Sequence, residues 1–196
     1  MNSEQSDSMS HSFHVTKAER EDIKGMLDLN YKIYPEEWHV SEDYVAEIMD
    51  KNPEVYNVVK VNDEIKGIYS LFPLNQHTYE GILNGTLEEG NLSEHLLDYD
   101  SPKEVYIYFI SLIVDIHDPM RKEFAKKIIR DIPKELQRLK EKGIEIKEIG
   151  AIAITEEGEN VLTRIGFRKM KKPLDMYNNS YPVLRASVDD IIKNIT

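Results

Sequence analysis

The spacing of apolar residues in the first part of the chain predicts two helices. Apolar side chains recur at helical spacing over residues 16–34 and again over residues 41–51, as on the buried face of an amphipathic helix. Thr16 and Glu19 have the spacing of a capping box, in which two side chains satisfy free backbone N–H groups at a helix start. We expect Pro35 to end the first helix, because proline cannot continue one.

The pattern then changes to short runs that are typical of strands. Val55–Val61 and Glu64–Leu71 are rich in β-branched and aromatic residues and predict an antiparallel hairpin. Residues 75–104 follow as an irregular, acidic connection, in which only Ser93–Tyr99 predicts a short helix. A connection of this length is more often functional, or an insertion, than a plain loop.

The strongest strand signal is Val105–Ile116, which is apolar on both faces and therefore predicts a central strand. A long helix is expected next, over Met120–Lys142, and Pro133 should kink or split it. The apolar stripe of this helix consists of Phe124, Ile128, Ile132, Leu136 and Leu139. Ile144–Ile154 predicts another strand, so this part of the chain forms a strand–helix–strand unit. Such units are parallel and right-handed in nearly all cases.

The C-terminal part predicts a further helix and a strand pair. Glu156–Ile165 fits a short helix that ends at a glycine. Phe167–Lys172 and Pro182–Val188 predict the strand pair, and Asp189–Ile195 predicts a terminal helical turn.

Length and composition indicate one globular domain. The chain has 196 residues, of which 40% are hydrophobic. Residues 1–12 are polar and include five serines, which predicts a disordered tail before a single domain over residues 13–196. The chain has no cysteine, which excludes disulfides, thiolate metal sites and cysteine nucleophiles, and favours a cytoplasmic protein. No residue pattern predicts a metal site.

The charge of the chain argues against binding to nucleic acid or to anionic membranes. The formal net charge is −11, whereas proteins that bind nucleic acid duplexes are usually basic. Basic residues nevertheless gather in two regions: residues 120–142 carry nine basic and four acidic side chains, and residues 164–172 carry five basic and no acidic ones. A local basic region on an acidic protein suits a small polyanion.

Three short motifs stand out within this order of elements. Gly67–Leu71 lies in the second strand of the hairpin, Ile116–Arg121 joins the central strand to the long helix, and Leu162–Phe167 carries the late helix to a Gly-Phe pair. Together they resemble the GNAT family, the GCN5-related N-acetyltransferases, with this chain as a divergent member. The resemblance implies an α/β fold of the α+β type, with a mixed, mostly antiparallel central sheet, a splayed parallel strand pair and flanking helices.

The resemblance also implies acetyl-CoA, or a longer acyl-CoA, as a co-substrate and no metal. The splayed strand would hold the pantetheine arm, and the following loop would hold the CoA phosphates. Arg121 and Lys122 would lie at the helix N-terminus, where free amides and the helix dipole also favour anions. The residues implied in CoA binding are Val114, Asp115, Ile116, Arg121, Lys122, Glu123, Phe124, Ala125, Lys126 and Thr155.

The sequence departs from the family pattern at two sites. Phe124 and Lys126 occupy the glycine positions of the phosphate loop, where glycines let backbone amides approach a pyrophosphate. Phe124 also begins the apolar stripe, so we expect it to be a core residue. Thr155 stands where the family often has an asparagine, and Leu162 where it has the tyrosine that acts as a general acid.

Transfer of an acyl group to an amine needs a base that removes a proton from the ammonium group. Asp115 is the candidate with the best position, near the end of the central strand. His117 is the second candidate, because the ordinary histidine pKa lies near neutrality. Tyr108 lies on the same strand, where packing is its expected role.

The prediction is an N-acyltransferase that moves an acetyl or other acyl group from CoA to an unidentified amine. The acidic remainder of the chain suits a cationic acceptor; it includes Glu36, Glu37, Glu88, Glu89, Glu94, Asp98 and Asp100. Trp38 lies in the connection that borders the acceptor cleft in the family. The alternative is a non-catalytic GNAT-like module that senses CoA or binds a partner. The sequence leaves the acceptor, the acyl length and the choice between monomer and dimer open.

Overall fold

A computed structural model describes residues 13–195 and contains a seven-stranded sheet flanked by helices. The strand order is β1-β2-β3-β4-β5-β9-β6, with β7 and β8 forming a separate hairpin. The strands are β1 (Val15–Lys17), β2 (Tyr56–Val61), β3 (Glu64–Leu74), β4 (Lys103–Val114), β5 (Ile144–Ile152), β6 (Arg168–Lys169), β7 (Leu174–Met176), β8 (Asn179–Tyr181) and β9 (Val183–Ala186). The helices are α1 (Ile23–Ile33), α2 (Glu42–Lys51), α3 (Gln76–Asn84), α4 (Leu92–His95), α5 (Arg121–Glu141), α6 (Glu156–Arg164) and α7 (Val188–Ile195), with short 3-10 turns η1 (Arg20–Asp22), η2 (Glu36–Trp38) and η3 (Glu89–Asn91).

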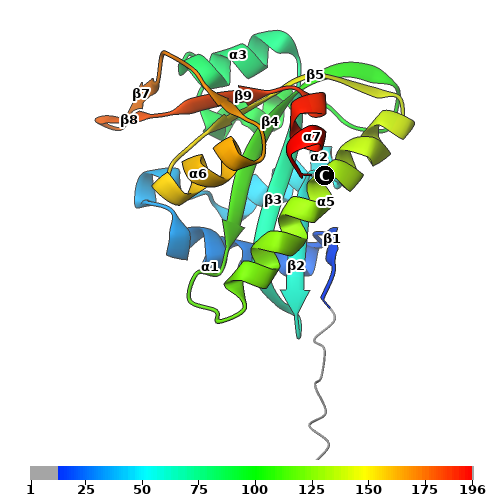
Figure 1. Ribbon diagram of the computed structural model, residues 1–196, viewed down its shortest axis with the longest axis vertical. Helices are drawn as coiled ribbons and strands as arrows, with labels where there is room; N and C mark the ends of the chain where they lie inside the picture. Colours follow the sequence, from blue (N-terminus) through cyan, green and yellow to red (C-terminus); the bar gives the residue numbers. More distant parts are fainter. Residues whose placement is uncertain (1–12, 196) are drawn as a thin grey trace, which may run out of the picture.

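The sheet is antiparallel except at its centre, where β4 and β5 run parallel. This confirms the expected mixed sheet with one parallel pair. The connection between the two parallel strands is α5, which crosses the front of the sheet in Figure 1. The parallel order follows from this connection, since two parallel strands need a long crossover between them.

Helices α5 and α1 cover opposite faces of the sheet, as neighbouring residues of β3 show. The Tyr69 hydroxyl donates to Asp131 of α5 at 2.6 Å. The preceding residue, Ile68, lines a cavity together with Met26 and Leu27 of α1. Successive side chains of a strand point to opposite faces, so β3 packs on α5 with one face and on α1 with the other.

The first helix begins later than the sequence predicted. Thr16 lies in β1, which pairs with the edge of β2, and the capping box is formed by Glu19 and Asp22 instead. Phe13, just before β1, is buried against the Phe124 ring at a centroid distance of 5.1 Å. Hydrogen bonds along the β2 edge and burial of Phe13 hold this segment extended, which a local capping pattern cannot reveal.

Residues 75–104 are not an irregular connection, as the sequence suggested. Residues 76–84 form α3. The Asn75 side chain caps the start of this helix by accepting a hydrogen bond from the Thr78 N–H at 2.8 Å, and the helix ends at Gly85, which has a φ of 80°. Its buried face consists of Tyr79, Ile82 and Leu83, and it packs on β4 and β5. The expected short helix at residues 93–99 is α4, which begins and ends earlier.

Helix α5 is continuous through Pro133 and neither splits nor ends there. A proline inside a helix costs about 3 kcal/mol. The expected stripe of five residues from Phe124 to Leu139 is buried, and each such side chain contributes roughly 1.5–3 kcal/mol. Burial of this stripe therefore outweighs the cost of the proline, and the prediction that Phe124 is a core residue is confirmed.

The C-terminal strand pair is confirmed as β6 and β9, and β9 also pairs with β5. Between them, β7 and β8 form a hairpin that the sequence did not predict. Its turn residues Tyr177 and Asn178 have φ values of 54° and 59°, which match a tight hairpin turn. In the described part of the chain, no helix has the length and apolar character that crossing a membrane would require.

Candidate active site

The parallel strands β4 and β5 diverge halfway along their length. Their last paired residues are Tyr108 and Gly150. Beyond this pair, β4 continues along β3 to Val114, whereas β5 continues along β9. Residues 109–114 of β4 therefore have one edge without a strand partner among the described residues. The divergence begins earlier than the sequence placed it, since Val114, Asp115 and Ile116 lie at its far end.

A bulge in β4 lies within this diverging stretch. On β3, Ile68 pairs with Ile113, but Ser70 pairs with Ile110. Strand β4 thus has one residue more than β3 between these pairs, and the Ser70 hydroxyl donates to the Ile110 carbonyl at 2.7 Å. Bulges twist a strand and are over-represented beside active sites.

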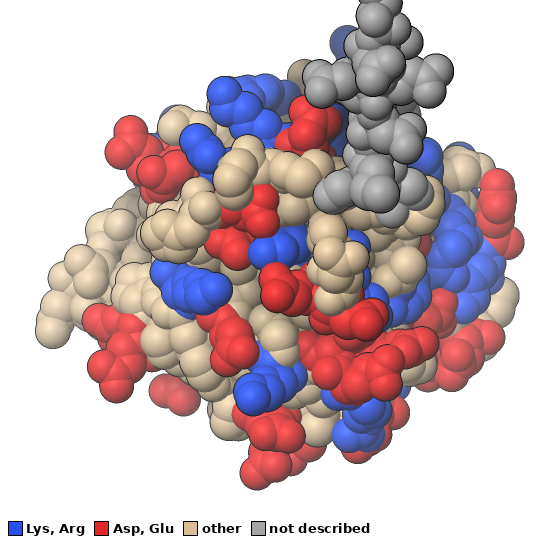
Figure 2. Space-filling view, turned by 90° about the horizontal axis from the view of Figure 1, so that it is seen from below, with Lys and Arg blue, Asp and Glu red and all other residues tan. Residues whose placement is uncertain are grey.

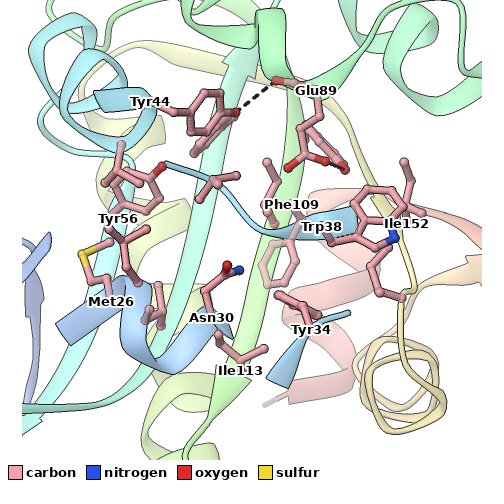
Figure 3. A pocket seen from close by; sticks show the side chains of 18 residues that line it. Met26, Asn30, Tyr34, Trp38, Tyr44, Tyr56, Glu89, Phe109, Ile113 and Ile152 are labelled. Atoms are coloured by element: carbon pink, nitrogen blue, oxygen red, sulfur yellow. Dashed lines mark hydrogen bonds between the residues drawn. The ribbon is translucent and has the colours of Figure 1, made fainter. Parts of the chain in front are cut away.

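A cavity of about 70 Å³ lies where the two strands part, between them and the helices α1 and α2 (Figure 3). Its walls are mainly aliphatic and aromatic side chains, contributed by α1, η2, α2, β2, β3, β4 and the end of β5. Enclosed apolar pockets with few polar groups are typical of ligand sites.

The Glu89 carboxylate points into this cavity from η3 (Figure 3). It accepts a hydrogen bond from the Tyr108 hydroxyl at 3.0 Å, and its backbone carbonyl accepts one from the Tyr44 hydroxyl at 3.1 Å. The residue as a whole is partly exposed. Its carboxylate, however, lies away from water, and this burial raises its pKa from 4.5 to about 7, although the bond from Tyr108 lowers it somewhat.

The tyrosines around Glu89 remain protonated. Burial, followed by the Glu89 charge, raises the pKa of Tyr34, Tyr44 and Tyr56 well above the ordinary value of 10. Their hydroxyl groups therefore act as hydrogen-bond donors at every physiological pH. A carboxylate with a pKa near neutrality and neighbouring donors is the arrangement that proton transfer requires.

Two further polar atoms of the cavity are buried and have no hydrogen-bond partner in the described residues: Oδ1 of Asn30 and Nε1 of Trp38. Asn30 is only 9% exposed, and Figure 3 shows its amide inside the cavity. Leaving such a group unpaired costs about 1–3 kcal/mol. Native proteins keep few of them, so these two atoms mark places where a ligand or an ordered water would supply the missing partner.

A smaller space of about 30 Å³ adjoins the cavity in the gap between the strands. It lies between Phe109 and Leu112 of β4 on one side and the end of β5 on the other. Tyr34 lines both spaces, and Leu162 of α6 lines the smaller one. The gap between the strands and the cavity beside α1 therefore share Tyr34 as a common wall.

The sheet with its diverging parallel strands matches known structures. Ard1 from Thermoplasma volcanium superposes with a TM-score of 0.58 and 12% identity, covering 88% of this chain and 95% of that one. The loading GNATL domain of CurA from Lyngbya majuscula gives 0.57 and 10%, with coverages of 91% and 98%. This protein has the GNAT fold. An aminoglycoside 6'-acetyltransferase type Ii matches similarly, with a TM-score of 0.55 and 12% identity over 89% and 96%.

The sequence itself is far from known members of this fold. No family model matches it, and no curated protein matches it in sequence. The GNAT-like fold is therefore visible in the structure, and the roles of individual residues have to be argued from their surroundings.

The loop between β4 and α5, where the sequence placed the CoA phosphates, satisfies most of its own amides. Asp115 Oδ1 accepts from the His117 N–H at 3.1 Å, and Asp118 Oδ1 accepts from the Met120 N–H at 2.8 Å. Backbone carbonyls of the loop accept from four more amides, those of Asp118, Arg121, Glu123 and Phe124. The N–H groups of Ile116 and Lys122 are those without a partner in the described residues.

The two aspartates of this loop are also paired with a lysine. Lys66 of β3 lies 3.0 Å from the Asp118 carboxylate and 3.7 Å from that of Asp115. The bond from the Met120 amide, and then that from Lys66, lowers the pKa of Asp118. Asp115 is buried and does not line the cavity around Glu89, so its visible role is to shape the turn. His117 is exposed.

The other residues predicted to bind CoA lie in four different surroundings. Arg121, Lys122 and Glu123 are exposed in the first turn of α5. Lys126 lines a separate basic groove with Lys127, Arg130 and Lys134. Ala125 is half-buried in α5. The hydroxyl of Thr155 accepts from the Gly158 N–H at 3.0 Å as the cap of α6.

Figure 2 shows the molecule from below the view of Figure 1, and basic and acidic side chains are interspersed on this face. Binding of the CoA phosphates by the residues predicted for it stays a prediction.

Sequence reasoning missed Glu89, Tyr34 and Asn30 as site residues. Glu89 was only one acid in an acidic segment, and no local pattern distinguishes it from Glu88. Tyr34 and Asn30 lie on the predicted first helix, where tyrosine and asparagine need no special explanation. The spacing of Asn30 and Tyr34, four positions apart on one helix face, is the one signal that they point the same way.

Proposed function

We propose that this protein is an N-acyltransferase that uses an acyl-CoA thioester and acylates an amine in the cavity beside Glu89. The observation that carries the proposal is the combination of two features: the edge of β4 over residues 109–114, which has no strand partner among the described residues, and the Glu89 carboxylate, which lines the adjoining cavity. A free strand edge offers backbone groups to an extended ligand with amide groups. The pantetheine arm of CoA is such a ligand.

In this proposal the donor lies between β4 and β5 and the acceptor lies in the cavity around Glu89. The thioester would reach the point where the two spaces meet, beside Tyr34. Val114, Asp115 and Ile116 follow the arm toward the loop, and Arg121 and Lys122 are the side chains nearest the phosphates. Because most loop amides are already satisfied, we propose that side chains contribute more to phosphate binding here than the backbone does.

The carboxylate of Glu89 is proposed as the base. It accepts a proton from the acceptor ammonium, the amine nitrogen then forms a bond to the thioester carbon, and the carbon–sulfur bond breaks. The departing thiolate takes up the second proton that the amine nitrogen loses as the amide forms. Leu162 lines the same gap and has no proton to donate, so we assign the hydrogen bond that stabilises the thiolate to the Tyr34 hydroxyl, which burial keeps protonated.

The second candidate function is a non-catalytic module that binds CoA or a protein partner. It is favoured by the loop, because the carboxylates of Asp115 and Asp118 already occupy amides that would otherwise face a pyrophosphate. Calorimetric titration of the protein with acetyl-CoA and with CoA tests the binding that both candidates can share, and transfer of the acyl group to an amine separates them. If neither acetyl-CoA nor CoA binds, the acyl-CoA proposal is overturned.

The chemical step is tested by rates of thiol release from acetyl-CoA with a panel of primary amines. Glu89→Gln keeps the shape and an acceptor for Tyr108, but removes the base, so we expect a loss of about a hundredfold or more in kcat. Asp115→Asn is expected to keep most of the rate, and Glu157→Gln, an exposed acid of α6, serves as the control. If Asp115→Asn loses the rate while Glu89→Gln keeps it, the base is Asp115 as the sequence suggested.

A further inference from the structure

We infer that the cavity beside Glu89 selects a primary ammonium group at the end of an unbranched aliphatic chain that carries a second positive charge. Transfer of an acyl group to this amine rests on the proposed function. Binding of the amine does not, because every group invoked for it lies in the cavity and its mouth.

The charge of the cavity determines the sign of its ligand. Among the described residues that line it, Glu89 is the one charged side chain, and no lysine, arginine or histidine lies with it. A buried carboxylate without a cationic partner is costly. An ammonium group supplies that partner, and it keeps its own charge at neutral pH because an alkylamine titrates near the lysine pKa of about 10.4.

One of the two unpaired polar atoms, the acceptor of Asn30, also suits an ammonium group. Asn30 Oδ1 is an acceptor without a donor, and an ammonium group brings three N–H donors. The rings of Tyr34, Tyr44, Tyr56, Tyr108 and Trp38 line the same space. Aromatic rings attract cations through their faces, most strongly where water is excluded.

The size of the cavity limits the shape of the chain that carries the ammonium group. A buried water needs roughly 10–15 Å³, so a cavity of about 70 Å³ has room for a chain end of about five non-hydrogen atoms. Its walls next to the polar atoms are methylene and methyl groups of Met26, Val45, Ile68 and Ile113. An unbranched aliphatic chain fits such walls, whereas a ring or a branched carbon close to the nitrogen does not.

The mouth of the cavity argues for a second positive charge. A wider space of about 200 Å³ shares Trp38 and Glu89 with the cavity and is lined by Glu37 and Glu88. It is also lined by His39, one ring nitrogen of which lies 2.7 Å from the Tyr34 carbonyl oxygen. Tyr177 at the tip of the β7–β8 hairpin closes its side and packs edge-on against Trp38, with ring centroids 5.5 Å apart. Two carboxylates and two aromatic rings at the far end of a short chain favour a second cationic group there.

This chemistry has two sources, a free aliphatic diamine and a lysine side chain in a basic peptide. Trp38 is the only tryptophan of the chain, and it lines both spaces. Its fluorescence therefore reports occupancy without any thioester present. We would titrate the wild-type protein with cadaverine, pentylamine, cyclohexylamine and a short lysine-containing basic peptide at about pH 8, where Glu89 is ionised and the amines remain charged.

Cadaverine is expected to change the Trp38 fluorescence at the lowest concentration, pentylamine at a higher one, and cyclohexylamine least. Glu89→Gln should weaken cadaverine binding about tenfold or more, because a hydrogen bond to a charged group is lost, and Glu157→Gln should leave it unchanged. If the peptide binds more tightly than cadaverine, the source is a lysine side chain and the ligand class stands.

Two results would overturn the inference: equal binding of cyclohexylamine and cadaverine, or unchanged cadaverine binding in Glu89→Gln. Cadaverine binding in a protein that binds neither acetyl-CoA nor CoA would keep the inference and reject the acyl-CoA proposal. Acetyl-CoA binding without any amine response would do the reverse.

Discussion

The carboxylates of Glu89 and Glu135 both lie away from water, and their neighbours give them opposite titration behaviour. Among the described residues that line its cavity, Glu89 has no cationic neighbour, and its carboxylate accepts a hydrogen bond from Tyr108, so burial dominates and raises its pKa to about 7. Burial alone would also raise the pKa of Glu135. Hydrogen bonds from Arg138, together with the positive charge of Lys17 and its hydrogen bond, outweigh burial and lower the pKa of Glu135. A buried acid thus becomes reactive or structural according to whether a cation lies beside it.

Glu89 predicts an unusual dependence of stability on pH. Its pKa is higher in the folded protein than in the unfolded chain, so the folded state binds more protons between about pH 4.5 and 7, and Glu89 destabilises the fold increasingly as the pH rises through that range. A pKa that rises from 4.5 to about 7 corresponds to at most about 3 kcal/mol. Glu89→Gln should therefore be stabilised relative to wild type at about pH 8 but little at about pH 4.5.

Urea unfolding of both proteins at several pH values measures this difference. If the difference in free energy of unfolding between Glu89→Gln and the wild type does not grow with pH, the Glu89 carboxylate is solvated. That result would also remove the physical reason for its role as a base.

At the scale of elements, the C-terminal helix depends on a close approach at Gly166. This residue has a φ of 112°, and a Cβ placed on it would lie 2.7 Å from the Asp190 carbonyl oxygen of α7. A backbone atom cannot swing away as a flexible side chain can. The turn after α6 and the start of α7 are therefore packed backbone to backbone.

Gly166→Ala is expected to cost about 2–4 kcal/mol, from the unfavourable φ and from overpacking together. Chemical denaturation measures the loss as a lower midpoint. Gly90→Ala is the matched control, because a Cβ there meets nothing within 4 Å. Equal stability of the two variants would contradict the close docking of α7.

Helix α3 shows how an element can form without a strong local signal. Its sequence has a cap at Asn75 and three apolar residues on one face, but also a glycine in its middle, Gly81. Its position is held from outside the helix. The Tyr79 hydroxyl donates to Glu148 of β5 at 2.8 Å, and Arg185 of β9 pairs with Glu80 at 2.7 Å. These contacts join residues far apart in the sequence, so they are invisible to a periodicity argument.

At the scale of the whole molecule, one charge cluster joins the beginning of the chain to its middle. Lys17 of β1 lies 2.5 Å from the Glu135 carboxylate of α5, which also accepts from Arg138 at 2.7 Å. Arg138 and Lys142 in turn pair with Glu54, just before β2. The cluster ties the edge strand β1 to α5 and to the start of the β2–β3 hairpin.

Glu135→Ala should cost about 1.5–3 kcal/mol, because it removes the charged hydrogen bonds that Lys17 and Arg138 make to Glu135, while Arg138 keeps its pairing with Glu54. Since the Glu135 pKa is lowered on folding, its contribution is complete above about pH 4.5 and is lost as the pH falls through the folded-state value. Urea unfolding at neutral pH measures the loss, and Glu141→Ala, an exposed acid of the same helix, is the control. Equal effects of the two substitutions would mean that the cluster contributes nothing.

The central part of the fold could be predicted from the sequence because its signals are local. The run of apolar residues from 105 to 116 specifies a buried strand wherever it is placed. The stripe from Phe124 to Leu139 specifies an amphipathic helix by its period alone, and the two together specify a parallel crossover. The order of the remaining elements then pointed to the GNAT fold, and the structure bears this out.

Tertiary structure decided the features that depend on a distant partner. Residues 15–17 are a strand because the edge of β2 is free to pair with them, and residues 76–84 are a helix because β4 and β5 bury one of its faces. The candidate site belongs to the same class. Glu89 acquires a shifted pKa only where η3, α1 and β4 enclose it, because burial and neighbouring charges are properties of the assembled cavity and not of any stretch of sequence.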